Sequence, residues 1–150
     1  NKIMSLQDPA SKMSKSDSNE NAYVLLMDKP DDIRRKFKRS VTDSIGMINY
    51  TDEQPGVKNL INIYSKITGK SPEETVLDFE GAGYAKLKED AAEAVIEELR
   101  PIQERIDYLL KNKDYLEKIY SAGAQKAEAA ARKTLRKVQK KVGFIPRQNG

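Results

Sequence analysis

Residues 87–109 read LKEDAAEAVIEELRPIQERIDYL and carry apolar side chains three or four positions apart over the whole stretch. The series is Leu87, Ala91, Val95, Leu99, Ile102, Ile106 and Leu109. Because residues at this spacing share one face of an α-helix, the stretch predicts a long amphipathic helix. Pro101 lacks an N–H group, so the carbonyl of Glu97 loses its partner and we expect a kink there rather than an end.

Three helices are predicted before this one, each with its own start or stop signal. Pro30 and the two aspartates after it open a helix over 30–40, since proline and early acids suit a first turn. A second helix spans 57–69 and a third opens with a capping box at 71–74 and ends near residue 81. The expected buried faces are Ile33, Phe37 and Val41; Val57, Leu60, Ile61, Tyr64 and Ile67; and Val76, Leu77 and Phe79.

A fifth helix is predicted from about residue 114 to Gly143, with an apolar stripe of small residues followed by larger ones. The stripe is Leu116, Ile119, Gly123, Ala127, Ala131, Leu135, Val138 and Val142, and its small members permit close helix packing. Residues 126–147 also contain eight basic residues against one acid, Glu128. These are Lys126, Arg132, Lys133, Arg136, Lys137, Lys140, Lys141 and Arg147. Such a block favours an anionic partner, although a solvated helix face explains it equally well.

Composition limits the classes of function. The 150 residues are 38% hydrophobic and 33% charged, enough apolar content for one ordinary domain with a core. Histidine and cysteine are both missing, which removes the usual general base, the commonest metal ligand and all disulfides. No apolar run reaches the roughly 20 residues of a membrane span, so we expect a cytoplasmic protein with no membrane contact. The predicted fold is all-α, a bundle of about five helices after an extended N-terminal segment.

The stretch Lys12–Ser16 reads KMSKS and lies in a segment without apolar periodicity. We call these five residues the signature loop. Two ammonium groups three positions apart, with hydroxyls beside them, can converge on a polyphosphate, because each donates without needing an acceptor. Where charge builds on leaving phosphate oxygens, such donors lower the barrier electrostatically and need no histidine. A solvated lysine-serine loop is the alternative interpretation.

The signature loop matches class I aminoacyl-tRNA synthetases at all five positions, and its surroundings resemble the bacterial tryptophanyl members of that family. The similar segments are SLQDP and KMSKSD near the start, RRKFKRSVTDS, PGVKNLINIYS, FEGAGYAKLK and LRPIQER. The resemblance covers essentially the whole chain, but the histidine motif and the parallel sheet of the family's Rossmann catalytic domain have no counterpart here. The chain therefore resembles the C-terminal half of such an enzyme.

The resemblance implies a two-step ligase that activates tryptophan with ATP and Mg2+ and then transfers it to tRNA. It implies that Lys12 and Lys15 are catalytic and that they hold the pyrophosphate together with Ser14. It also implies that Met13 lies near the adenine and that Ser16 belongs to the same ATP-binding loop. Residues 1–29 would end the catalytic domain, and 30–150 would form a helical domain of the anticodon-binding type. We expect no metal site in this chain and no tightly bound cofactor.

The implied partners are tRNA(Trp) and the N-terminal catalytic half of the same enzyme, whose parent is expected to be a homodimer. Lys86 and Lys88, after a glycine-rich turn, are the first candidates for tRNA contact. Arg132, Arg136 and Lys140 on the last helix are the second. Three alternatives stay open: the corresponding part of a tyrosyl enzyme, a helical nucleic-acid-binding module with no enzymatic parent, and a protein-interaction bundle.

Overall fold

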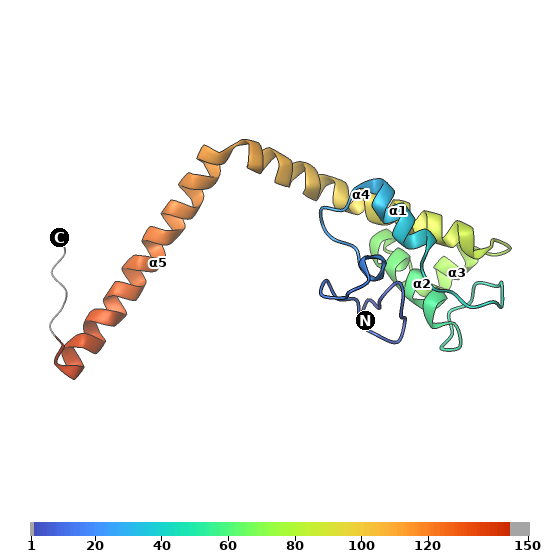
Figure 1. Ribbon diagram of the computed structural model, residues 1–150, viewed down its shortest axis with the longest axis horizontal. Coiled ribbons are helices and arrows are strands. Elements are labelled where there is room, and N and C mark those ends of the chain that lie inside the picture. The colour runs from blue at the N-terminus through green and yellow to red at the C-terminus, as the bar shows by residue number, and fades with distance from the viewer. Residues whose placement is uncertain (1, 145–150) are drawn as a thin grey trace. The chain divides into compact units, whose positions relative to one another are not determined.

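A computed structural model describes residues 2–144 and contains five α-helices in this part of the chain (Figure 1). Their bounds are α1 Pro30–Lys38, α2 Pro55–Thr68, α3 Pro72–Asp78, α4 Tyr84–Lys111 and α5 Lys113–Val142, with one 3-10 turn over Glu20–Ala22. The described residues form no β-strand and only one isolated bridge, between Met4 and Lys12. The predicted all-α fold with five helices is confirmed, and no parallel sheet occurs within residues 2–144.

Helix starts and stops follow signals in the sequence. A proline occupies the first turn of α1, α2 and α3, where its missing N–H has no helical partner to lose. The Ser71 hydroxyl accepts from the Glu74 N–H at 3.1 Å, and the Glu74 carboxylate accepts from the Ser71 N–H at 2.7 Å, which completes the predicted capping box. Gly69 and Gly143 end α2 and α5 in the left-handed region, with φ of 75° and 76°.

The hydrophobic core forms where α1, α2 and α4 meet. Its largest fully buried apolar side chains come from these helices and from the N-terminal segment: Phe37, Leu6, Ile33, Leu60, Ile61, Leu87 and Val57. The expected faces of α1, α2 and the first half of α4 are thus confirmed at most of their positions. Because Leu6 is 1% exposed within this core, the N-terminal segment packs as part of the same structure as the helices.

The chain divides into two compact units, Asn1–Glu104 and Arg105–Gly150, so that the boundary falls inside α4. The first unit contains the core, the signature loop and helices α1 to α3. The division predicted from sequence, between residues 29 and 30, stays a prediction. Among residues 2–144 no helix is both long and apolar enough to cross a membrane.

Three sequence predictions about buried faces are wrong. Val41 is 44% exposed because α1 ends at Lys38, and its N–H donates instead to the Leu6 carbonyl at 2.8 Å. Leu77 is 69% exposed because α3 is short and buries Thr75 instead. None of the residues of α5 is buried, although its stripe was expected to pack. Its large members Ile119, Leu135 and Val138 are about half exposed, because periodicity shows which residues share a face but not whether another surface covers them.

Gly56, in the first turn of α2, contacts the backbone that follows α1. A Cβ at this position would lie 2.1 Å from the Val41 carbonyl oxygen, which cannot rotate away as a side chain can. We expect Gly56→Ala to lower the free energy of unfolding by about 2–3 kcal/mol, the upper part of the usual range for overpacking, because the obstructing atom belongs to the backbone. Urea denaturation measures this change. The matched control is Gly123→Ala in α5. A Cβ there would have no heavy atom within 4 Å outside the neighbouring backbone of its own helix, and alanine favours the helix. Equal midpoints for both variants would contradict the close contact.

Candidate functional site

The signature loop (Lys12–Ser16) extends from a pairing between two extended segments. The Ser5 N–H donates to the Ser11 carbonyl at 2.8 Å, and the Met13 N–H donates to the Ile3 carbonyl at 3.1 Å. These two hydrogen bonds fix residues 11–13, the N-terminal side of the loop, against residues 3–5. The sequence predicted a loop here, but gave no sign that its base would be fixed by backbone pairing.

Asn59 of α2 fixes the same base to the helical core. Its side chain accepts from the Met4 N–H at 2.9 Å and donates to the Met4 carbonyl at 2.8 Å, so that it satisfies both backbone groups of one residue. Asn59 is 2% exposed, and a buried amide with both ends paired holds a single geometry. Sequence analysis missed this residue. Asn59 does not belong to the expected buried face, because it lies about 100° from Leu60 around the helix axis, so the apolar pattern gave no signal for it.

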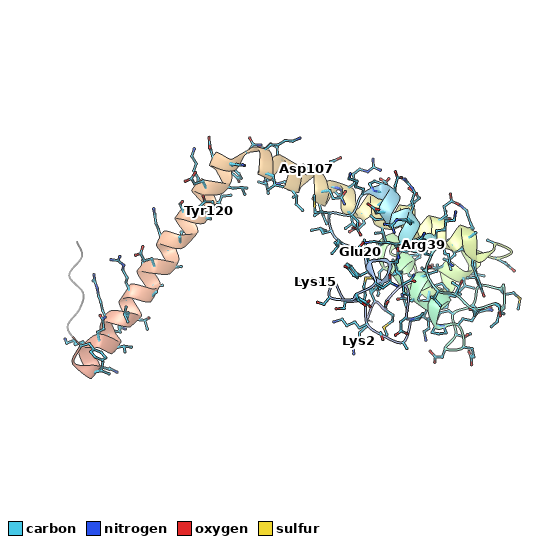
Figure 2. The ribbon with its side chains drawn as sticks, viewed as in Figure 1. Lys2, Lys15, Glu20, Arg39, Asp107 and Tyr120 are labelled. Carbon is cyan, nitrogen blue, oxygen red and sulfur yellow. The ribbon has the colours of Figure 1, made fainter. Side chains whose placement is uncertain are left out.

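The tip of the loop is a turn around Lys15, which Figure 2 labels. The Asp17 N–H donates to the Ser14 carbonyl at 3.2 Å, and the Ser16 N–H donates to the Ser14 hydroxyl at 3.3 Å. Lys12 and Lys15 are both exposed, and neither forms an ion pair within the described residues. Two free cations therefore stand on a fixed base, which is an arrangement suited to an incoming anion.

Met13 differs from its neighbours in the loop because it is only partly exposed and packs against the hydrophobic core. The apolar residue anchors the loop while the polar residues on either side face solvent.

A buried ion pair fixes the segment that leads from the loop to α1. The Nζ of Lys36 lies 2.5 Å from the Oδ2 of Asp28, and the two side chains are only 4% and 13% exposed. The same carboxylate oxygen accepts from the Leu25 N–H at 2.9 Å, and the Lys36 ammonium lies 5.3 Å from the centre of the Tyr23 ring. Burial of both charges makes each dependent on the other. This pair also escaped sequence analysis.

Lys86 and Lys88, the first candidates for tRNA contact, lie on different sides of α4 because two residues turn a helix by about 200°. Lys86 is exposed and pairs with Asp90 at 2.7 Å, and this hydrogen bond raises the pKa of Lys86. Lys88 is half-buried and donates to the Ser40 carbonyl at 2.7 Å. Burial lowers the pKa of Lys88. The structure does not bring the two side chains together, and Lys88 has a structural partner.

The second set of candidates lies on one side of α5. Arg132, Arg136 and Lys140 follow each other at intervals of four residues, and all three are exposed. Together with their neighbours they form what we call the basic arc: Arg132, Lys133, Arg136, Lys137, Lys140 and Lys141. Arg132 pairs with Glu128 at 2.7 Å. Arg147, counted in the basic block of the sequence, lies outside the described residues.

A polar cluster that the sequence did not reveal orders the long loop before α2. The Tyr84 hydroxyl donates to Asp43 at 2.5 Å and accepts from the Gly46 N–H at 3.1 Å, while the Gln54 amide donates to the Tyr84 oxygen at 2.8 Å. Burial acts to raise the pKa of Asp43, but hydrogen bonds from Tyr84 and from the Ile45 N–H outweigh it and hold that pKa below its ordinary value. The cluster joins the loop to the start of α4.

Residues 2–144 contain no group of three or more histidine, cysteine, aspartate or glutamate side chains arranged to hold a metal ion. The loop can therefore supply positive charge and hydroxyl donors but no carboxylate cage. Donors of this kind are able to bind and stabilise an oxyanion.

Comparison with known proteins identifies relatives along the whole chain. The family model described as "tRNA synthetases class I (W and Y)" matches residues 1–100. A tryptophan-tRNA ligase of Clostridium perfringens is 61% identical over 146 residues, which cover 97% of this chain and 44% of that protein. A tryptophan-tRNA ligase of Enterococcus faecalis is 46% identical over 144 residues, covering 95% of this chain and 43% of the relative. The chain thus spans less than half the length of these curated relatives.

The fold has a counterpart among solved structures. A crystal structure of tryptophanyl-tRNA synthetase from Mycoplasma pneumoniae matches with a TM-score of 0.73 at 28% sequence identity. The match covers 96% of this chain and 44% of that chain. Its coverage agrees with that of the sequence relatives.

Proposed function

The chain belongs to the class I tRNA synthetases for tryptophan and tyrosine, and from this membership we propose that it forms the C-terminal part of a tryptophan-tRNA ligase. Its signature loop would act in tryptophan activation by ATP, and its helices would contact tRNA(Trp). The observation that carries the proposal is 61% identity to a tryptophan-tRNA ligase over a match that includes 97% of the chain. The relatives compared above are tryptophan enzymes, so the tyrosyl alternative is not favoured.

In the proposed reaction the tryptophan carboxylate attacks the α-phosphorus of ATP, and the bond to the bridging oxygen of pyrophosphate breaks. Negative charge grows on the departing oxygens. Lys12 and Lys15 would meet this charge with ammonium groups, and the Ser14 hydroxyl would add a neutral donor. Ser16 would complete the loop around the phosphates. Because the base of the loop is already fixed, little ordering would be needed when ATP binds.

Magnesium would enter this reaction as the counter-ion of ATP. The described residues contain no carboxylate cluster that could bind Mg2+ by itself. The chain alone would therefore hold neither ATP nor Mg2+ tightly. The acceptor for the second step would be tRNA(Trp), bound through Lys86 and the basic arc, with Lys88 as a weaker candidate because it already bonds Ser40. The complete enzyme would combine this chain with an N-terminal catalytic half, as a homodimer in the cytoplasm.

A nucleic-acid-binding module without an enzymatic parent explains the observations less well. It accounts for the basic arc, but it gives no reason for a signature loop whose base is clamped by Asn59 while its lysines stay free. A protein-interaction bundle leaves both lysine clusters without a role.

A chimera tests the proposal. We expect this chain, joined to the part of the Clostridium perfringens relative that precedes the match, to catalyse tryptophan-dependent pyrophosphate exchange and to charge tRNA(Trp). The 150-residue chain alone should fold with helical circular dichroism and a cooperative melt, but should show no exchange. The control chimera carries Lys15→Ala and should fold equally well with much lower exchange. A folded chimera without activity, or turnover by the chain alone, would contradict the proposal.

A further inference from the structure

The six cations of the basic arc form two parallel rows on α5 (Figure 1 shows this helix in orange and red). Arg132, Arg136 and Lys140 form one row, and the residue after each forms the other. Each row spans eight residues, or about 12 Å of helix, with about 6 Å between successive cations. Each residue turns the helix by about 100°, so the two rows lie about 100° apart and each shifts by about 80° around the axis along its length. Together the six cations cover about half of the helix circumference.

The charge of the arc is largely uncompensated. In the described part of the chain only Arg132 has an acidic partner, Glu128, and the other five cations form no ion pair. No acid lies between Glu128 and the end of α5. A helix segment that carries this much repulsion gains most from a partner with regularly spaced negative charge.

Resting on the proposed function, we propose that the basic arc binds a double-helical segment of RNA, across its minor groove, through phosphates and 2′-hydroxyls. Two parallel rows about 100° apart around the helix suit two backbones better than one. A-form RNA has a wide and shallow minor groove bordered by both strands, and proteins recognise it there by shape and charge. The partner of α5 would thus be a duplex arm of the tRNA rather than its unpaired nucleotides.

The absence of aromatic side chains separates duplex from single-stranded RNA. Proteins that bind unpaired nucleotides stack the bases on aromatic rings. Residues 121–142 of α5 contain no phenylalanine, tyrosine or tryptophan, so the rows themselves offer no platform for a base. One exposed ring, Phe144, follows the end of the helix, and a single ring cannot stack a run of successive bases. It offers point charges and guanidinium groups, which contact backbone phosphates without reading sequence.

A membrane surface fits the helix less well. Amphipathic helices that lie on bilayers bury a broad apolar face rich in large side chains. Opposite the arc, residues 131–142 offer only Leu135, Val138 and Val142 as large apolar side chains. The preceding turns of the stripe are glycine and alanine, so the apolar area is small while the charged area is large.

The test measures binding of the 150-residue chain to a blunt RNA duplex of 16 base pairs by fluorescence anisotropy, between 50 and 200 mM salt. The variant Arg136→Gln/Lys137→Gln/Lys140→Gln removes three cations, and glutamine preserves helix propensity. We expect its affinity to fall at least about tenfold at low salt, and the slope of log affinity against log salt to flatten by about three. The matched control, Lys113→Gln/Lys118→Gln/Lys126→Gln, removes the same charge from the same helix outside the arc and should retain most of the affinity.

Each other outcome overturns the inference. Equal losses in both triple variants would show that net charge, not the arc, binds RNA. Tighter binding to an unstructured single strand of the same length would reassign the arc to unpaired nucleotides. Binding to phosphatidylserine vesicles that duplex RNA does not displace would identify a membrane helix. If the chimera charges tRNA(Trp) but the chain does not bind the duplex, the inference fails and the proposed function stands. If the chain binds the duplex but the chimera is inactive, the proposed function fails and the duplex-binding arc stands.

Discussion

Replacing Lys15 with alanine in the complete enzyme is expected to lower the rate of tryptophan activation by roughly 10²–10³-fold, the usual cost of removing one preorganised donor. Charge on the pyrophosphate oxygens is larger in the transition state than in ATP, so an ammonium group that reaches them binds the transition state better. The loss should therefore appear in kcat. The affinity for tryptophan should change little. The pyrophosphate leaves from one side of the α-phosphorus and the tryptophan carboxylate attacks from the other, so Lys15 does not reach the tryptophan.

Two substitutions control this result. Lys15→Arg keeps the charge but should restore only part of the rate, because a planar guanidinium does not replace a compact ammonium in a tight turn. Lys66→Ala removes an exposed lysine from α2, away from the loop, and should leave the rate unchanged. Pyrophosphate exchange at saturating tryptophan measures all three variants. Equal rates for Lys15→Ala and Lys66→Ala would contradict a role for the loop in activation.

The second large effect is expected from Lys36→Met, which leaves the Asp28 carboxylate buried without its cation. Breaking one partner of a buried pair typically costs about 3–5 kcal/mol, since the remaining charge has lost both water and partner. Methionine keeps most of the apolar stem of lysine, so the expected loss of about 3 kcal/mol in the free energy of unfolding reports the charge rather than a cavity. Urea denaturation of the 150-residue chain measures it.

The double variant Asp28→Asn/Lys36→Met separates the pair from its two members. It should be more stable than Lys36→Met alone, because no unpaired charge remains buried. Lys70→Met serves as the exposed counterpart: Lys70 pairs with Asp78, with the side chains 44% and 38% exposed, and its loss should cost less than about 1 kcal/mol. A Lys36→Met variant no less stable than Lys70→Met would show that the 2.5 Å contact between Lys36 and Asp28 does not stabilise the fold.

Much of the helical structure could be predicted from sequence because its signals are local. The capping box at Ser71, the proline that opens α1 and the glycine that ends α2 each act within one turn, and all three hold in the structure. The stripe of α5 was misjudged for the opposite reason. Periodicity shows which residues share a face, but burial depends on a partner surface that the pattern does not describe.

The lysines of the candidate site were singled out from the sequence, and their role stays a prediction; the contacts that hold them in place could not be predicted. The two lysines of the signature loop carry their meaning in spacing and residue type, which the sequence displays directly. Asn59 and Lys36 act through contacts 55 and 8 positions away, with Met4 and Asp28. Lys88 was singled out as an RNA contact, yet its ammonium bonds the Ser40 carbonyl 48 positions earlier. Contacts of this kind depend on the tertiary fold.

The central proposal is that the signature loop stabilises the departing pyrophosphate. Pre-steady-state kinetics of the complete Lys15→Ala enzyme test it most directly, by resolving adenylate formation from transfer of the tryptophanyl group to tRNA. Transfer starts after pyrophosphate has left, so we expect adenylate formation to slow by roughly 10²–10³-fold while transfer from preformed adenylate stays close to its normal rate. Unchanged adenylate formation together with a collapse of transfer would contradict the proposal and assign the loop to tRNA.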